Sequence, residues 1–256
     1  MAYLERQMIS LCGKAIHGWR MIAEGDKVAL GLSGGKDSLG LLWLLRERMR
    51  RIPIEFELTP MHIDMGFGNV DVAALRRFCA ELGLDLLVFE SDFGPRAHSP
   101  ENRKNSPCFF CALKRRAQMF KMCREHGCNK LALAHHQDDI FETFLMNILH
   151  AGNISTMLPV QALFRGELKI IRPLSLIGAD QTRRFAQVKE LPVQPPCCPS
   201  AGQTTRAQAG RALDGFFRDN KKSRANLWRA LTHAGLASLP APPTTMRLGR
   251  KKSDSK

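Results

Sequence analysis

The chain has 256 residues and a formal net charge of +14 at pH 7. An excess of positive charge this large favours a polyanionic partner, nucleic acid before membrane. No apolar stretch approaches the roughly 20 residues that cross a bilayer, and residues 1–12 have no secretory signal. We therefore expect a cytoplasmic protein that binds no membrane. Its eight cysteines then favour metal binding or catalysis over disulfides.

Segments that favour strands and helices alternate along the middle of the chain. This order predicts a doubly wound, mainly parallel α/β sheet covered by helices. The predicted strands are residues 28–32, 55–63, 85–90, 130–134 and 168–171. The predicted helices are residues 38–50, 70–82, 108–126 and 138–149, and the chain is mostly helical from residue 180 on. Residues 91–107 are expected to form a polar loop, long enough to have a function.

The sharpest local motif is the hexapeptide Ser33–Ser38, which lies between the first predicted strand and the first predicted helix. Glycines let backbone N–H groups approach an anion, and the helix N-terminus adds a favourable partial charge. A P-loop of the Walker type would have Gly at Leu30 and Ser or Thr at Asp37. The Asp37 carboxylate repels phosphate unless a cation lies between them, so the motif predicts phosphates bound with Mg²⁺. The alternative is a tight strand-to-helix turn with a capping side chain.

Two acidic residues, Asp138 and Asp139, open the helix after the fourth predicted strand. In a doubly wound sheet this helix start shares the carboxyl edge with the loop. Capping of the helix needs only one acid, so the pair favours a role with metal and phosphate. The sequence leaves open which of the two contacts metal, and we choose Asp138 as a catalytic candidate. His135, beside this pair, and Asp64, directly after the second predicted strand, are further candidates for cofactor binding.

Cys108 and Cys111 form a C-x-x-C pair at a predicted helix start, where thiolates are stabilised electrostatically. A zinc half-site, a redox dithiol and an iron–sulfur half-site all fit this pair. Cys123 lies roughly 18 Å further along the helix, at about 1.5 Å per residue, too far to share a metal ion. The cysteines expected to be ordinary thiols are Cys12, Cys79, Cys123 and Cys128.

Cys197 and Cys198, in a Pro-rich loop, are the remaining candidates to complete the site. Adjacent side chains in extended backbone point to opposite sides. We therefore expect only one of these two cysteines to join the C-x-x-C pair.

The hexapeptide resembles the pyrophosphate-binding loop of the ATP pyrophosphatase (PP-loop) family. Most of the chain resembles one branch of it, the tRNA 2-thiocytidine synthetase family, with Ala134 where that family has Gly. The segments that carry this resemblance are Gly13–Ile16, Met21–Asp26, Ser33–Ser38, Cys108–Arg116, His135–Ile140 and Leu168–Leu174.

The resemblance implies an enzyme that adenylates the C2 oxygen of a tRNA cytidine, at position 32, and replaces this oxygen with sulfur while ATP becomes AMP and pyrophosphate. It implies Lys36, Asp37 and Asp138 as catalytic residues. The implied cofactor-binding residues are Ser33, Gly34, Gly35, Lys36, Asp37, Ser38, Asp64 and His135.

The resemblance also implies a [4Fe–4S] cluster with three protein ligands, which leaves one iron free to carry sulfide. Two ligands are Cys108 and Cys111. The third ligand in that family precedes an Arg by eight positions, as Cys198 precedes Arg206, so we choose Cys198 and keep Cys197 in reserve. The Pro-Cys-Cys-Pro arrangement departs from that family's spacing.

The expected organisation is a helical N-terminal segment (1–24), a PP-loop ATP-binding α/β domain (25–180), a helical segment with the third cysteine ligand (181–238) and a basic flexible tail (239–256). The expected partners are tRNA and a sulfur donor system such as a cysteine desulfurase, and a homodimer is considered. The alternatives are a PP-loop thiolase that acts on a tRNA uridine and a non-catalytic iron–sulfur or ATP-binding protein that binds RNA. A small-molecule adenylating synthetase is disfavoured by the charge and the cysteines.

Overall fold

A computed structural model describes residues 2–68, 70–100, 102, 106–195, 198–199 and 204–233. The expected tail, 239–256, and the reserve ligand Cys197 lie outside these residues. The chain forms two compact units, Met1–Asp214 and Gly215–Lys256. All the candidate site residues of the described chain belong to the first unit.

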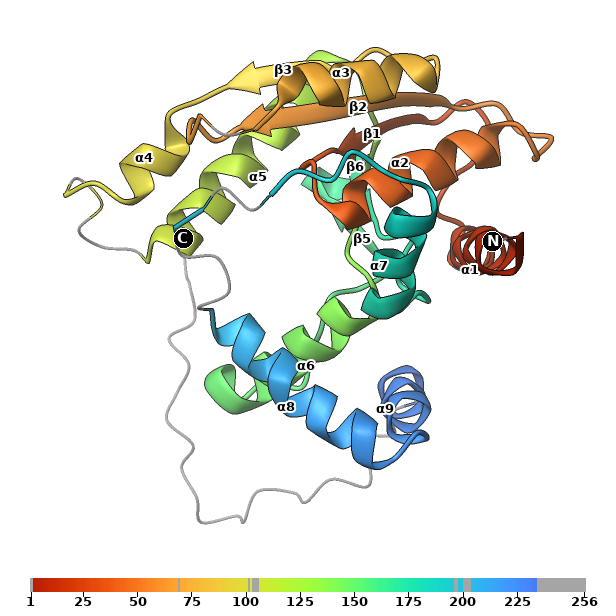
Figure 1. The fold of residues 1–256 in the computed structure, drawn as a ribbon, viewed down its shortest axis with the longest axis vertical. Coiled ribbons are helices and arrows are strands. Elements are labelled where there is room, and N and C mark those ends of the chain that lie inside the picture. Colours follow the sequence, from red (N-terminus) through yellow and green to blue (C-terminus); the bar gives the residue numbers. More distant parts are fainter. Residues whose placement is uncertain are drawn as a thin grey trace. The chain divides into compact units, whose positions relative to one another are not determined.

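The centre of the first unit is a six-stranded sheet with the order β3-β2-β1-β4-β6-β5 (Figure 1). The strands are β1 (Lys27–Gly31), β2 (Glu57–Asp64), β3 (Leu87–Glu90), β4 (Lys130–Ala132), β5 (Val160–Leu163) and β6 (Leu168–Ile171). All neighbouring strands pair in parallel except β5, which is antiparallel to β6. The expected doubly wound, mainly parallel sheet is confirmed, and β5 is an addition to it.

The helices that the structure describes are α1 (Ala2–Gly18), α2 (Lys36–Met49), α3 (Val72–Glu81), α4 (Phe93–Ala97), α5 (Pro107–Glu125), α6 (Gln137–Ala151), α7 (Ala179–Val188), α8 (Thr205–Asp219) and α9 (Ser223–Thr232). A 3₁₀ turn, η1 (Phe164–Gly166), joins β5 to β6. The four helices predicted between residues 38 and 149 are confirmed within a few residues. The long loop expected at 91–107 is wrong in part, because its first half contains α4.

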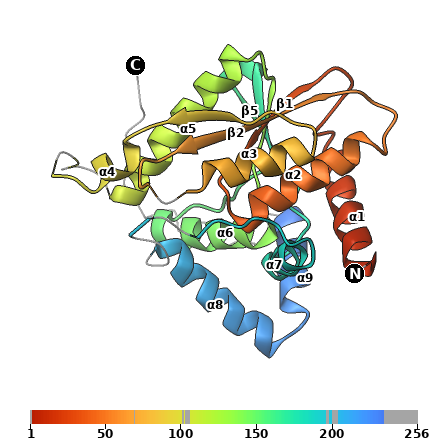
Figure 2. The same ribbon diagram turned by 45° about the horizontal axis from the view of Figure 1, so that its top comes forward.

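Two hydrophobic layers cover the two faces of the sheet. On one face α1, α2, α3 and α7 pack together, and Phe185 of α7 meets Trp43 of α2 edge-on at a centroid distance of 5.4 Å. On the other face Met119, Met122 and Cys123 of α5 pack against β1, β2, β4 and β6. Burial on both faces explains why the central strands are continuous apolar runs. Figure 2 shows α5 together with α2 and α3 around the sheet.

The strand order reverses at the boundary between β1 and β4, because the chain moves outward from β1 to β2 and β3 and then returns to the other side. In open α/β sheets, ligands bind at the carboxyl ends of the strands at such a switch point. Here these ends lead into the Ser33 loop and into residues 133–136. None of the described helices is long and apolar enough to span a membrane.

Candidate active site

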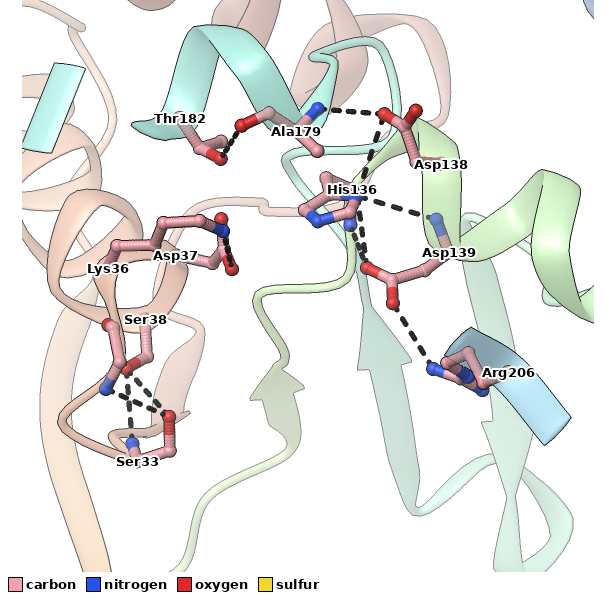
Figure 3. Close-up of polar contacts among 11 residues, drawn as sticks. Ser33, Lys36, Asp37, Ser38, His136, Asp138, Asp139, Ala179, Thr182 and Arg206 are labelled. Atoms are coloured by element: carbon pink, nitrogen blue, oxygen red, sulfur yellow. Dashed lines mark hydrogen bonds and ion pairs between the residues drawn. The ribbon is translucent and has the colours of Figure 1, made fainter. Parts of the chain in front are cut away.

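The Ser33–Ser38 loop is held in shape by its own two serines (Figure 3). The Ser33 N–H donates to Ser38 Oγ at 3.2 Å, the two hydroxyl oxygens are 3.1 Å apart, and Ser38 Oγ donates to the Gly35 carbonyl at 2.9 Å. Gly34 adopts a φ of +82°, which favours glycine. Gly35 is the N-cap of α2 without a side-chain hydrogen bond. The first N–H groups of α2 are therefore available to an anion.

The Asp37 carboxylate has two different oxygens. Oδ2 pairs with Lys36 Nζ at 2.6 Å. Oδ1 is buried, and within the described chain it has no hydrogen-bond partner. A buried carboxylate oxygen without a partner is costly. The donor set, a carboxylate oxygen beside a phosphate-type loop, fits a Mg²⁺ ion.

A cavity of about 900 Å³ opens beside this loop. Ser33, Gly35, Asp37 and Ser38 line one side of it. The other described residues of the lining that matter here are Asp64, Arg115, Arg116, His135, His136, Asp139, Arg172, Cys198 and Arg206. Four arginines and the loop give the cavity a chemistry that suits phosphate groups.

The two acids at the start of α6 both lie near the His136 ring, whose Nδ1 is 3.9 Å from Asp138 Oδ2 and 3.2 Å from Asp139 Oδ2, and they differ in their other contacts. His136 and Asp139 form a reciprocal capping box, in which the His136 N–H donates to Asp139 Oδ2 at 2.9 Å. Asp138 Oδ2 instead accepts from the N–H of Ala179, the first residue of α7, at 2.7 Å (Figure 3). Of these two acids, Asp139 is the one among the described residues that line the cavity. The catalytic role of Asp138 stays a prediction.

Arg206, near the start of α8, bonds to two residues of α6. Its guanidinium donates to Asp139 Oδ1 at 3.1 Å and to Thr143 Oγ1 at 3.4 Å. The spacing to Cys198 singled out this arginine in the sequence. The ion pair holds the start of α8 at the edge of the cavity.

His135 is held as a neutral ring. Burial is the main cause that lowers its pKa to about 4. Its Nδ1 accepts a hydrogen bond from Arg172 Nε at 3.3 Å, so Nε2 carries the ring hydrogen. Burial likewise lowers the pKa of Arg172 to about 10, which leaves this residue charged. His135 thus offers an N–H donor, and Arg172 a positive charge, at the cavity.

Asp64 lies at the end of β2 and lines the cavity. Its Oδ1 accepts from the N–H of Gly66 at 2.8 Å. Gly66 has a φ of +79°, and a Cβ there would lie 2.3 Å from the Ser91 carbonyl oxygen. A glycine is therefore required for the turn that orients Asp64.

The C-x-x-C pair occupies the first turns of α5. Ser106 caps this helix, its Oγ accepting from the Phe109 N–H at 3.3 Å, and Pro107 stands in the first turn. Cys108 is exposed and Cys111 half-buried. The pair lies at a capped helix start, as the sequence predicted. The electrostatic stabilisation expected of the thiolate is wrong for Cys111, because burial raises the pKa of this thiol.

Cys198 reaches the cavity from the Pro-rich segment. Its Sγ lies 3.8 Å from His98 Nε2. Burial is the main cause that raises the pKa of Cys111, and Cys198 is the next, with Arg115 opposing it and Cys108 adding to it. Both other thiols are thus near enough to act on Cys111 electrostatically.

No three His, Cys, Asp or Glu side chains of the described chain are grouped closely enough to hold one metal ion. In a [4Fe–4S] cluster each thiolate binds a different iron, so its ligands lie farther apart than the ligands of a single metal ion. Three thiols that interact electrostatically, around a half-buried Cys111, fit such a cluster in chemistry. The ligand set Cys108, Cys111 and Cys198 stays a prediction.

The other cysteines of the described chain are core residues. Cys12, Cys79, Cys123 and Cys128 are buried. Burial raises the pKa of Cys12 and Cys123 to about 12 and that of Cys79 to about 11. These thiols stay protonated at neutral pH and pack as small apolar side chains.

The sequence did not identify His62 or Arg172 as residues that line the cavity. His62 is buried in β2, lines the cavity and donates from Nδ1 to the Leu32 carbonyl at 2.8 Å. A polar residue within an apolar strand was the available signal for His62. For Arg172 the signal was a charge placed directly after β6, at the carboxyl edge.

A doubly wound sheet with a non-Walker phosphate loop at its switch point defines an ATP-binding α/β protein. Residues 4–193 match the family model described as the PP-loop domain. A protein of Citrifermentans bemidjiense is 32% identical over 223 residues, which cover 86% of this chain and 88% of the relative. One from Syntrophotalea carbinolica is 35% identical over 230 residues, 89% of each chain. Both are named tRNA-cytidine(32) 2-sulfurtransferase.

Among solved structures, the U34-tRNA thiolase NcsA from Methanococcus maripaludis with its [4Fe-4S] cluster superposes with a TM-score of 0.75. It is 24% identical, and the match covers 94% of this chain and 81% of that one. This likeness extends the fold assignment to nearly the whole chain. The chain belongs to the PP-loop family and, within it, to the family of tRNA-cytidine(32) 2-sulfurtransferases.

Proposed function

We propose that this protein is an ATP-dependent tRNA thiolase that replaces the C2 oxygen of cytidine 32 with sulfur, the activity named for its relatives. One observation carries the proposal. A single cavity of about 900 Å³ is lined both by the Ser33 loop and by Cys198. Activation by ATP and delivery of sulfur to the same base require these two groups to share one chamber.

The loop binds the β- and γ-phosphates of ATP. The Ser33–Ser38 contacts keep its shape, and the first N–H groups of α2 face the anion. Lys36 adds a positive charge, and Asp37 Oδ1 is the oxygen that would hold Mg²⁺. Charge on the leaving pyrophosphate is thereby neutralised.

Adenylation begins when the C2 oxygen of the cytosine attacks the α-phosphorus and pyrophosphate leaves. The base then carries AMP as a leaving group, and sulfur displaces it at C2. Arg115, Arg116 and Arg172 line the cavity and offset negative charge on phosphate groups. The neutral His135 donates from Nε2 to an acceptor in the cavity.

Cys108, Cys111 and Cys198 would hold a [4Fe–4S] cluster. Bound by three thiolates, the cluster supplies one iron with an open position for sulfide. The Asp139–Arg206 pair holds the start of α8 at the cavity edge. A sulfur donor system such as a cysteine desulfurase supplies the sulfur. The enzyme works in the cytoplasm. A homodimer is compatible with this scheme.

The test uses a strain from which the gene is deleted. Mass spectrometry of its tRNA nucleosides should find no 2-thiocytidine, and the wild-type gene should restore it. The Lys36→Ala gene should express a folded protein that fails to restore it. Unchanged 2-thiocytidine in the deletion strain would overturn the proposal, and loss of a thiolated uridine instead would identify a uridine thiolase.

A further inference from the structure

Residues 191–195, here called the strap, run from the end of α7 along the Ser33 loop. The Gln194 N–H donates to the Gly34 carbonyl at 2.9 Å. A Cβ on Gly34 would lie 2.9 Å from Gln194 Cγ and 3.2 Å from Gln194 Cβ. Glycine at position 34 therefore serves two purposes, a positive φ and close approach of the strap.

The Gln194 side chain adds two further hydrogen bonds. Its Oε1 accepts from the Asp71 N–H at 3.0 Å, and its Nε2 donates to the Pro192 carbonyl at 3.1 Å. Asp71 is the N-cap of α3 and accepts from the Ala74 N–H at 2.8 Å. Gln194 thus bonds to the loop through its backbone N–H and to the start of α3 through its side chain.

The strap is also fixed at its beginning. Leu191 is buried, and its N–H donates to the Ala186 carbonyl in α7 at 3.0 Å. Gln194 packs against Gly34, and neither of them is among the residues that line the cavity, whereas Ser33, Gly35, Asp37 and Ser38 line it. The strap and an anion in the cavity therefore contact different residues of the same short loop.

The strap ends three residues before Cys198 in the sequence. Cys198 lines the cavity, and its charge contributes to the raised pKa of Cys111. A shift of the Gly34 peptide moves the backbone to which Gln194 is bonded, four residues before Cys198. The Ser33 loop thus contacts a segment that is anchored at Leu191 and Gln194 and that closely precedes Cys198 in the sequence.

We propose that Gln194 is a positioning residue that couples nucleotide binding in the Ser33 loop to the position of Cys198. The inference rests on the proposed function, in that Cys198 is a cluster ligand. ATP that fixes the Gly34 peptide fixes the strap, and the cluster fixes the strap from its other end. Coupling between two sites is reciprocal, so each ligand must strengthen the binding of the other.

The experiment uses anaerobically purified full-length protein without tRNA, so that no turnover occurs. Two quantities are measured: the rate at which a chelator removes iron, with and without Mg·ATP, and the Kd for ATP, with and without the cluster. In the wild type, ATP should slow iron loss about 5-fold or more, and the cluster should lower the Kd for ATP about 5-fold or more. Gln194→Ala keeps the backbone hydrogen bond to Gly34 but loses the side-chain contacts with Gly34, Asp71 and Pro192. Both factors should therefore fall toward 1, while iron content per chain is retained.

Two further variants separate the causes. Gln194→Met keeps a side chain of similar length against Gly34 but lacks the bonds to Asp71 and Pro192, so it should retain only part of the coupling. Gln187→Ala, at an exposed site on α7, is the matched control and should behave as the wild type. If Gln194→Ala does not fold, the test rests on Gln194→Met compared with the wild type. The effect of ATP on iron loss and the effect of the cluster on the Kd for ATP are then measured in these two proteins.

The outcomes distinguish the two proposals. A wild-type protein with a cluster whose iron loss and ATP affinity are independent of each other overturns the coupling and leaves the thiolase proposal intact. Full coupling in Gln194→Ala overturns the role of Gln194. A wild-type protein that binds no iron overturns the thiolase mechanism and this inference together.

Discussion

At the scale of single residues, Asp37 offers the clearest test of ATP chemistry. Its Oδ2 is neutralised by Lys36, whereas Oδ1 is buried without a partner in the described chain. Asp37→Asn keeps the shape and removes the charge that a cation needs. We expect pyrophosphate release with tRNA and ATP to fall by about 10²-fold or more, with an unchanged melting temperature.

The matched control for this substitution is Asp180→Asn. Asp180 also stands in the first turn of a helix, but it is exposed and pairs with Arg183. This variant should release pyrophosphate at the wild-type rate. Normal release by Asp37→Asn would show that the loop does not bind a metal–phosphate group through Asp37.

The cysteines fall into two environments, and substitution should separate them. Replacing Cys108, Cys111 or Cys198 with Ala should remove the brown chromophore and the thiolation of tRNA. Cys123→Ala should keep both, because burial raises the pKa of that thiol to about 12 and it lies on the buried face of α5, packed against the sheet. Iron and sulfide analysis with absorbance spectra makes the comparison. A chromophore retained in Cys198→Ala would exclude Cys198 as a ligand.

At the scale of elements, α6 has an acid whose protonation changes near neutral pH. Burial first, and then Asp139, raise the pKa of Glu142 from 4.5 to about 7. Between these values the folded state binds more protons than the unfolded state. The stability from this group is therefore fully present below about pH 4.5 and is lost as the pH rises through about 7.

Glu142→Gln replaces the titrating acid with a neutral side chain of the same shape. Between pH 5 and 8 the wild type should lose stability relative to this variant, by about 1 kcal/mol because partial exposure to solvent screens the charge. Urea unfolding at both pH values measures the difference. A constant difference between wild type and variant across this range would contradict the raised pKa.

The sequence predicted the elements whose signals are local. The apolar run Val28–Leu32 identified β1, and Gly127 marked the end of α5. The strand β5 was missed because Val160–Leu163 is only half-buried at the edge and is defined by its pairing with β6. The short α4 was missed because five residues containing a proline carry no helical period.

The sequence predicted the individual motifs of the candidate site but not the long-range contacts between them. The loop, the helix start and the C-x-x-C pair are contiguous motifs with their own chemistry. Besides the neighbouring His136, Asp138 bonds to Ala179 and Asp139 to Arg206, which lie far away in the sequence. The contact of Gln194 with Gly34 likewise joins segments that are distant in the sequence. Such pairings follow from tertiary packing, which no local pattern encodes.

At the scale of the whole molecule, the net charge of +14 should appear as salt-dependent binding of tRNA. Arg115 and Arg116 line the cavity, and Lys114 precedes them on α5. Changing all three to Gln should weaken tRNA binding and flatten the plot of log Kd against log salt. The slope should fall by about one unit for each tRNA phosphate that is no longer neutralised. Fluorescence anisotropy over a salt series measures the slope.

The control removes three positive charges from the opposite end of the sheet. Lys27 begins β1, and Arg50 and Arg51 follow the end of α2, away from the carboxyl edge. Their change to Gln should alter the slope much less. Equal slopes for the two triple variants would mean that tRNA binds through overall charge and not through the cavity mouth.

The central claim is that one cavity couples ATP cleavage to thiolation of a cytidine. The most direct measurement combines purified cluster-containing protein, tRNA, ATP and sulfide, and counts products by mass spectrometry. We predict one AMP and one pyrophosphate for each 2-thiocytidine, with all the new sulfur at position 32. Thiolation without AMP, AMP release without thiolation, or sulfur on another base would contradict the account.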